Sequence, residues 1–167
     1  MGAENQQERS ETNGWVVGFV DGEGTFSVSI FKNKTTKRGW QVFPEFIVTQ
    51  GSKSKLALED LQQFFDCGKV FVNHRFDNHQ EDLYRYCVRS LKDLKSKIIP
   101  FFENHSLRTA KKADFVVFCE IIKLIDQKKH LDLEGLNEIA QLTYKMNDGG
   151  AKTFLKSSET ICQSTFR

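Results

Sequence analysis

The stretch from Gly14 to Gly24 constrains the fold more than any other part of the sequence. It reads GWVVGFVDGEG, so it changes from apolar to acidic and glycine-rich within a few residues. Gly14, Gly18 and Gly22 recur every four residues, which places them in one stripe on a helix. A stripe without side chains lets another backbone approach closely. We therefore predict a helix that ends at about Asp21 and packs through its glycines.

The end of this predicted helix has the chemistry of a cation site. Gly22-Glu23-Gly24 cannot sustain a helix well. The last carbonyl groups of the helix then stay unpaired and carry partial negative charge. Asp21 and Glu23 add two carboxylates, and a hard cation such as Mg²⁺ prefers oxygen ligands. Two interpretations of the stretch remain open: a metal site, or a buried helix with a glycine C-cap and two solvated acids.

Length and composition are those of one ordinary folded domain. The chain has 167 residues, of which 39% are hydrophobic and 15 are Phe, and this content excludes a disordered chain. The apolar run before Asp21 is far shorter than the roughly 18 residues that span a bilayer. The four cysteines are widely spaced, which excludes a zinc motif and predicts free thiols in a reducing compartment.

The two ends of the chain are polar. We expect residues 1–11 to be disordered or to be an extension foreign to the domain, residues 12–147 to form the domain, and residues 148–167 to be a loosely ordered tail. A helix start is predicted at Thr12 or Asn13. Residues 1–13 have neither the apolar stretch of a signal peptide nor the Arg-rich character of a transit peptide.

Hydrophobic periodicity predicts the order helix, hairpin, helix, hairpin, helices. A period of two predicts strands at Thr25–Phe31, Trp40–Gln50, Lys69–Arg75 and Leu83–Arg89. Helical spacing predicts further helices at Ser54–Phe65, Leu91–Phe102 (ending near Pro100), Thr109–Lys128 and Leu133–Met146. In the third of these, Phe115, Val116, Phe118, Cys119, Ile122 and Ile125 are expected inside. The order predicts an α+β fold with an antiparallel sheet and helices on one face.

The other face of the predicted sheet is polar and cationic. The net charge is only +2, so nucleic-acid binding must be sought in how the charges are distributed. This face and the hairpin tip carry Ser27, Ser29, Lys32, Asn33, Lys34, Lys37, Arg38, Gln41, Glu45, Lys69, Asn73, Arg75, Arg85 and Arg89. A β-ribbon fits the DNA major groove, and basic tips suit phosphate contacts. Solvent-facing strands are polar in any case, and Phe31, Phe43, Ile47 and Phe71 share the outward parity.

The chain resembles the LAGLIDADG homing endonucleases. Residues 16–24, VVGFVDGEG, resemble the nine-residue motif of that family, with Val for Leu at the start and Glu for the second Asp. Residues 46–50, 64–70 and 99–102 also resemble family landmarks. The resemblance covers nearly the whole chain beyond residue 12. It implies the α-β-β-α-β-β-α fold with a saddle-shaped sheet.

The resemblance implies a homodimer, because the motif occurs once in a chain of this size. Gly14 and Gly18 would pack against their copies, and Asp21 would cap and hold the helix pair. Both copies of Glu23 would then meet in one groove of double-stranded DNA. The implied function is cleavage of one phosphodiester on each strand, with 3′ overhangs, in a long and nearly palindromic target of a group I intron host gene.

The resemblance also assigns a metal site. Glu23 matches the metal-binding acid, and the Gly22 carbonyl is the implied second ligand. The cofactor would be Mg²⁺ or another divalent cation such as Mn²⁺, which activates water and stabilises the leaving oxygen. Gln50 matches a residue that orients the attacking water.

Two basic residues that the resemblance leads us to expect are displaced. Ala110 stands where a lysine is expected after Thr109, so either Lys111 or Lys112 replaces it or the activity is weakened. Ser54 stands where a second basic residue is expected after Gln50, and Lys53 is the nearest candidate.

Two alternatives to the endonuclease stay open. One is an intron maturase of the same fold that binds intron RNA, and the other is a catalytically weakened DNA-binding dimer. We expect an intracellular protein of a bacterial cytoplasm, a chloroplast or a mitochondrion, because all three suit a reduced, intron-encoded protein.

Overall fold

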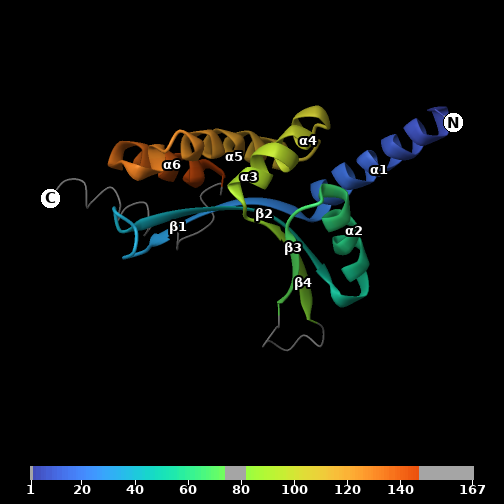
Figure 1. The fold of residues 1–167 in the computed structure, drawn as a ribbon, viewed down its shortest axis with the longest axis horizontal. Coiled ribbons are helices and arrows are strands. Elements are labelled where there is room, and N and C mark those ends of the chain that lie inside the picture. Colours follow the sequence, from blue (N-terminus) through green and yellow to red (C-terminus); the bar gives the residue numbers. More distant parts are fainter. Residues whose placement is uncertain (1, 74–81, 147–167) are drawn as a thin grey trace. The chain divides into compact units, whose positions relative to one another are not determined.

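A computed structural model describes residues 2–73 and 82–146, with side chains from residue 6 onward. The chain runs through its elements in the order that the periodicity predicts (Figure 1). The main elements are α1 (Gly2–Glu23), β1 (Gly24–Lys32), β2 (Trp40–Gly51), α2 (Lys55–Phe65), β3 (Lys69–Asn73), β4 (Leu83–Val88), α3 (Leu91–Asp93), η2 (Leu94–Ile98), α4 (Ile99–Asn104), α5 (Lys111–Asp126) and α6 (Leu133–Met146). Short 3₁₀ turns, η1 (Ser52–Ser54) and η3 (Lys129–Leu131), precede α2 and α6.

The described strands form one four-stranded sheet in the order β1-β2-β4-β3. Strand β4 pairs antiparallel with β2 and with β3, with Val48 opposite Tyr86 and Val70 opposite Tyr86 on its two sides. The β1–β2 turn is closed by a hydrogen bond from the Asn33 N–H to the Gly39 carbonyl, at 2.8 Å. The predicted α+β fold with an antiparallel sheet is therefore confirmed.

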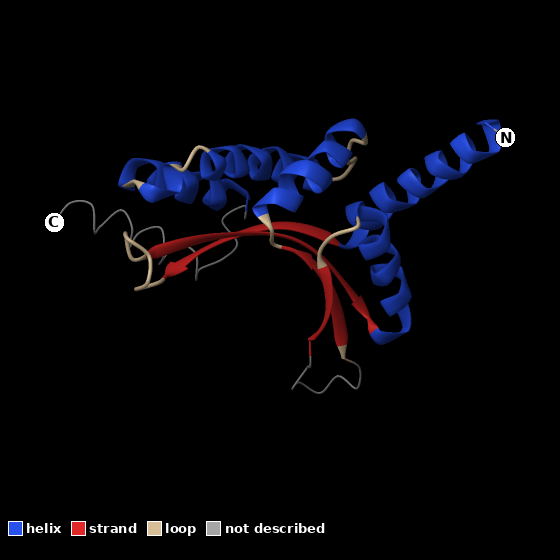
Figure 2. Ribbon diagram, in the orientation of Figure 1, coloured by secondary structure: helices blue, strands red, loops and turns tan. Residues whose placement is uncertain are grey.

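The chain divides into two compact units, Met1–Thr25 with Glu45–Lys112, and Phe26–Pro44 with Ala113–Arg167. In the first unit, α2 packs against β3 and β4 (Figure 2). Phe46 and Tyr86 are fully buried there, and Phe46 contacts the rings of Phe65 and Phe102 at centroid distances of 6.1 and 5.7 Å. Phe46 and Tyr86 thus form an aromatic core, but burial does not alternate along these strands: Ile47, which the sequence placed on the outward face, is only 5% exposed.

In the second unit, the buried face of β1 meets α5. The Phe26 ring lies 5.1 Å from the ring of Phe115 and 5.3 Å from that of Phe118. Val116 was predicted to be inside but is 59% exposed, because a helix turns about 100° per residue and the side chain after Phe115 points away from the sheet. Ile121, which the sequence reasoning omitted, is fully buried instead.

Helix α1 begins well before the predicted start at Thr12 or Asn13. Residues 2–11, expected to be disordered, are helical and rich in good helix formers. The Thr12 hydroxyl donates to the Glu8 carbonyl one turn earlier, so Thr12 lies inside the helix and does not cap it. These residues are exposed wherever their side chains are described. Because the segment buries no apolar face, it has no apolar periodicity from which the helix could be predicted. Residues 148–167, expected to form a tail, lie outside the described residues.

The helical segment after β4 also continues past its predicted end. Helix α4 starts at Ile99 with Pro100 in its first turn and runs to Asn104. Pro has no N–H to donate, and the preceding η2 is a π-helix whose wider turn adapts the chain to it. Within the described part of the chain, no helix is both long and apolar enough to cross a membrane.

Candidate active site at the end of the first helix

Asp21, in the last turn of α1, ties the helix to the segment before α5. Its carboxylate accepts hydrogen bonds from the backbone N–H of Arg108 (2.9 Å), the backbone N–H of Thr109 (3.1 Å) and the Thr109 hydroxyl (2.8 Å). Partial burial acts to raise the pKa of Asp21, but these hydrogen bonds outweigh it and the pKa lies below its ordinary value of 3.8. The carboxylate is therefore ionised at neutral pH and acts within one chain.

Lys111 places its ammonium group at the C-terminal end of α1. Its Nζ donates to the Asp21 carbonyl at 2.7 Å and to the Gly22 carbonyl at 2.8 Å. A cation at this position satisfies carbonyls that the helix leaves unpaired and opposes the negative end of the helix dipole. Ala110 is exposed beside it, and the Lys112 side chain has no hydrogen bond or ion pair within the described ranges. Of the two lysines that the sequence left open, the structure places Lys111 beside the motif.

Glu23 is the last residue of α1, and its side chain is exposed. It makes no side-chain hydrogen bond or ion pair with the residues that the structure describes. Strand β1 then begins directly at Gly24. Glycine fits this position because a Cβ here would lie 2.8 Å from the Val20 carbonyl oxygen. The tight junction leaves the Glu23 side chain exposed, and Glu23 directly follows the two residues whose carbonyls hold Lys111.

The chemistry of this junction fits part of a divalent-cation site. Its donors are one carboxylate and main-chain carbonyls, which are hard oxygen ligands, and an ammonium group already occupies the carbonyls. Among the described residues, no group of three or more His, Cys, Asp or Glu side chains could hold a metal ion. The oxygen donors of one chain would therefore hold only part of a coordination shell.

Gln50 and Lys53 lie at the far end of β2 and in the turn that follows it. Gln50 is half-buried and pairs with Tyr84 across the sheet. Its side chain makes no hydrogen bond to a described residue. Lys53 is exposed in η1, and Ser54 occupies the position before α2. The structure brings Lys111 to the motif, and the roles of Gln50 and Lys53 stay predictions.

The glycine stripe of α1 lies open in the single chain. Gly14, Gly18 and Gly22 are exposed, and a Cβ added at any of them would meet no atom within 4 Å. On the opposite side of the same helix, Val16 and Val20 are fully buried. Helix α1 therefore has one face in the core, whereas its glycine face meets no partner among the residues that the structure describes.

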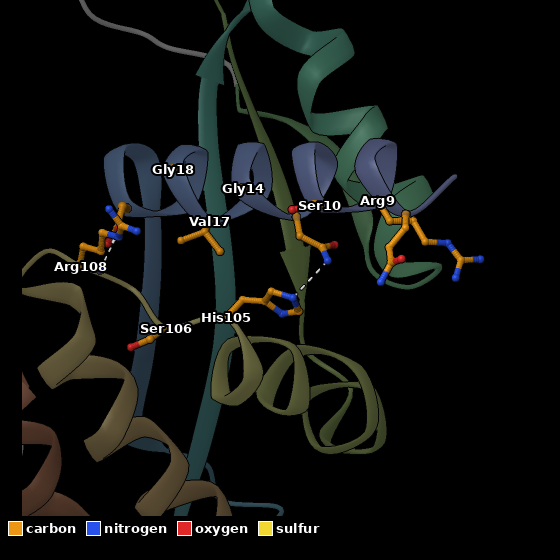
Figure 3. A pocket seen from close by; sticks show the side chains of 11 residues that line it. Arg9, Ser10, Gly14, Val17, Gly18, His105, Ser106 and Arg108 are labelled. Atoms are coloured by element: carbon orange, nitrogen blue, oxygen red, sulfur yellow. Dashed lines mark hydrogen bonds between the residues drawn. The ribbon is translucent and has the colours of Figure 1, made fainter. Parts of the chain in front are cut away.

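A groove of about 720 Å³ runs along this open face (Figure 3). Gly14, Val17 and Gly18 line one side, and the segment from His105 to Arg108 lines the other. The His105 ring joins the two sides, because its Nε2 lies 3.1 Å from the Asn13 amide nitrogen and its Nδ1 lies 3.0 Å from the Phe101 carbonyl. The carbonyl can only accept, so Nδ1 carries the proton and Nε2 accepts from Asn13.

On the outer face of the first unit, cationic side chains are held by neighbours. Arg89 Nε donates to Glu45 Oε1 at 2.5 Å, and its guanidinium lies 5.4 Å from the centre of the Phe71 ring. Arg85 is half-buried, whereas Lys69 and Asn73 are exposed. Arg75 lies outside the described residues. The exposed ring of Phe71 is thus in contact with the Arg89 guanidinium.

In the second unit, the tip of the β1–β2 hairpin combines fixed and exposed groups. Asn33 Nδ2 donates to Gln41 Oε1 at 2.6 Å, and the Lys32 ammonium lies 5.6 Å from the centre of the Trp40 ring. Arg38 Nε donates to the Leu131 carbonyl at 3.3 Å. Four other residues of this unit that the sequence predicted to bind DNA have no such side-chain contact with a described residue: Ser27, Ser29, Lys34 and Lys37. The two lysines are exposed.

Sequence reasoning expected a catalytic lysine just after Thr109 but missed the contact of this segment with Asp21. Arg108 and Thr109 contact Asp21 through backbone N–H groups, which any residue type can supply. The signal that could have found Thr109 is its place just before α5, because its hydroxyl accepts from the Lys111 N–H at 3.3 Å. The contact between Asn13 and His105 could not be predicted from the residues around either one, because they lie 92 positions apart in the sequence.

Comparison with known proteins identifies the family of this chain. Residues 16–122 match the LAGLIDADG endonuclease family. Probable intron-encoded endonuclease 3 of Neurospora crassa is 38% identical over 146 residues, which are 87% of this chain and 26% of the relative. Homing endonuclease I-ApeII of Aeropyrum pernix is 29% identical over 147 residues, which are 87% of this chain and 84% of the relative. The chain spans between 26% and 33% of the length of three curated fungal relatives.

Solved structures agree with the sequence matches. The crystal structure of the homing endonuclease I-TnaI superposes with a TM-score of 0.80 at 40% identity, covering 89% of this chain and 97% of that one. I-SmaMI bound to an uncleaved DNA target in the presence of calcium ions gives a TM-score of 0.75 at 34% identity, covering 85% of this chain and 47% of that one.

Proposed function

Because this chain belongs to the LAGLIDADG endonuclease family, we propose that it is a homing endonuclease that cuts double-stranded DNA at a specific site. The observation that carries the proposal is the end of α1, where the Lys111 ammonium binds the Gly22 carbonyl and the next residue, Glu23, has an exposed side chain. Relatives named as intron-encoded endonucleases and a relative structure bound to DNA support it. Their names also favour an intron as the origin of this chain.

The working unit that we propose is a homodimer. Gly14, Gly18 and Gly22 leave one face of α1 bare, and a second copy of the same helix fits such a face backbone to backbone. The contact would be isologous, so each chain gives and receives the same surface. Pairing at Gly22 would bring the two copies of Glu23 close together, and this supports completion of a cation site that one chain provides only in part.

The proposed reaction is hydrolysis of one phosphodiester on each strand, which leaves 3′ overhangs. Glu23 and the Gly22 carbonyl would hold Mg²⁺ or another divalent cation such as Mn²⁺. When bound, the cation would polarise the phosphate and stabilise the leaving oxygen. Lys111 would add a positive charge for the phosphate at the end of α1, and Asp21 fixes the segment that carries Lys111. Gln50 would orient the attacking water.

Recognition would use the outer surface of each unit. Lys34 and Lys37 at the hairpin tip are exposed and suit phosphate contacts. Arg85 suits guanine edges in the major groove, and Arg89 would do so after exchanging its contact with Glu45 for one with a base. A dimer presents these surfaces twice about its two-fold axis, which supports a long, nearly palindromic target. The weakened-enzyme alternative relied on Ala110, and the contact of Lys111 with the end of α1 supports the proposal that Lys111 takes the role of the expected lysine.

The test is cleavage of a plasmid that carries the intronless junction of the host gene. We expect linear product with 3′ overhangs in Mg²⁺, no product after the metal is chelated, and binding that survives chelation. A matched plasmid with the intron inserted at the junction should stay uncut. Binding to the junction without cutting in Mg²⁺ or Mn²⁺ would contradict the enzyme and favour the DNA-binding dimer.

A further inference from the structure

The ammonium of Lys111 occupies the carbonyl oxygen that the proposed metal site needs. Lys111 Nζ lies 2.8 Å from the Gly22 carbonyl oxygen and 2.7 Å from the Asp21 carbonyl oxygen, and it is half-buried. We propose that Lys111 is the resident cation of the metal-free chain and competes with the divalent cation for the end of α1. This inference rests on the proposed function, because it assumes a cation site at Glu23 and Gly22.

Electrostatics makes simultaneous occupancy unfavourable. A carbonyl oxygen that accepts from an ammonium group at 2.8 Å already faces a unit positive charge, and a second cation on the same oxygen would repel the first at close range. The Glu23 carboxylate lies outside this contact, since it makes no hydrogen bond or ion pair with the described residues. It therefore stays available to attract a divalent cation while Lys111 is still in place.

On this proposal, Lys111 leaves the end of α1 while the segment before it stays in place. The segment that carries it is fixed through backbone groups, by the hydrogen bonds from Arg108 and Thr109 to Asp21. The Lys111 side chain can thus swing away while its backbone stays anchored, and it then carries its charge into the space that a phosphate would enter. On this account, Lys111 first occupies the carbonyl oxygens at the end of α1 in the metal-free chain. Once a divalent cation is bound, its ammonium faces the substrate phosphate.

The first measurement is Mn²⁺ binding to the full chain, followed by the electron paramagnetic resonance signal of free Mn²⁺. Lys111→Met removes the competitor, and we expect it to bind Mn²⁺ about fivefold to tenfold more tightly than the parent chain, since two charge-assisted hydrogen bonds no longer oppose binding. Lys111→Arg keeps the charge and should stay near the parent affinity. Lys112→Met, which loses the same charge one residue away, is the matched control and should change little.

The second measurement is acetylation of lysines by an amine-reactive ester, read for each lysine by mass spectrometry, with and without Mg²⁺. Lys111 should be labelled slowly in the metal-free chain and several-fold faster in Mg²⁺, while Lys112 should be labelled equally in both. Because both lysines lie in one chain, Lys112 controls for any effect of Mg²⁺ on the reagent.

The inference is overturned if Lys111→Met binds Mn²⁺ no more tightly than the parent chain, including the case in which neither binds it. It is also overturned if Lys111 stays protected at saturating Mg²⁺. A chain that releases Lys111 in Mg²⁺ but cuts no DNA would contradict the proposed function alone. A chain that cuts DNA while Lys111 stays protected would contradict this inference alone.

Discussion

The two faces of helix α1 differ sharply in burial. Val16 and Val20 on one face are fully buried, whereas Gly14 and Gly18 on the other are exposed with empty space beyond them. The buried face is explained by the fold of this chain, because it removes apolar surface from water. The open face buries no such surface among the described residues. The difference teaches that burial in this chain explains only one half of the helix, and the proposed function assigns assembly and chemistry to the other half.

The largest effect should come from Glu23, at the end of the open face. Glu23→Gln keeps the shape of the side chain and removes its charge, so we expect the cleavage rate to fall at least about a hundredfold, as for other lost catalytic groups. The unfolding transition should not move, because Glu23 has no partner among the described residues. Glu11→Gln, exposed on the same helix, is the control. Normal cutting by the Glu23 variant would show that the metal site lies elsewhere.

Gly18→Leu tests the open face itself. A leucine here enters empty space in one chain and is a better helix former than glycine, so the isolated subunit should not lose stability. The same side chain would separate two helices that meet at Gly18. We expect a folded monomer by light scattering, with cleavage lost. A Gly18→Leu protein that keeps the parent mass would place the interface on another surface.

Val20→Ala is the matching change on the buried face and should have the opposite result. It removes two methylene-sized groups from a fully buried site, which should lower the free energy of unfolding by about 2 kcal/mol. At temperatures where the chain remains folded, its mass should match that of the parent. A stable but monomeric Val20→Ala protein would break the division between the two faces.

Asp21→Asn should have the smallest effect, and one that depends on pH. The Asp21 pKa is lowered in the folded chain, so ionised Asp21 stabilises the fold above its ordinary pKa of 3.8 and loses that contribution as the pH falls through the folded value. We expect a loss of about 1 kcal/mol at neutral pH, discounted for exposure. The difference from the parent should shrink below about pH 4. A constant difference down to pH 2 in urea unfolding would mean that the charge is not responsible.

Local patterns predicted much of this molecule because they act over a few residues. The alternation in β1 correctly buries Phe26, Val28 and Ile30, and the predicted helix at Leu133–Met146 has the bounds of α6. The glycine spacing likewise placed Gly14, Gly18 and Gly22 on one face of a helix, and all three are exposed on α1, while the predicted packing of another backbone against them stays a prediction. In each case the pattern and the structure share one period, so the face follows from the sequence.

Other features depend on contacts between residues far apart in the chain. Asp21 was predicted to act at the helix pair, yet the structure shows it holding the backbone of Arg108 and Thr109 in its own chain. No periodicity reports such a contact. For the same reason, the sequence could not choose between Lys111 and Lys112, which are neighbours with the same side chain. Tertiary structure places the ammonium of Lys111 on the end of α1.

The mass of the protein in solution tests the central claim most directly, because we propose that the open face of α1 binds a second copy of the chain. Sedimentation equilibrium in Mg²⁺-free buffer, at the concentration used for cleavage, measures it without any knowledge of the DNA target. The account predicts a particle of twice the chain mass of 19.3 kDa. A particle of 19.3 kDa that still cuts both strands would contradict it.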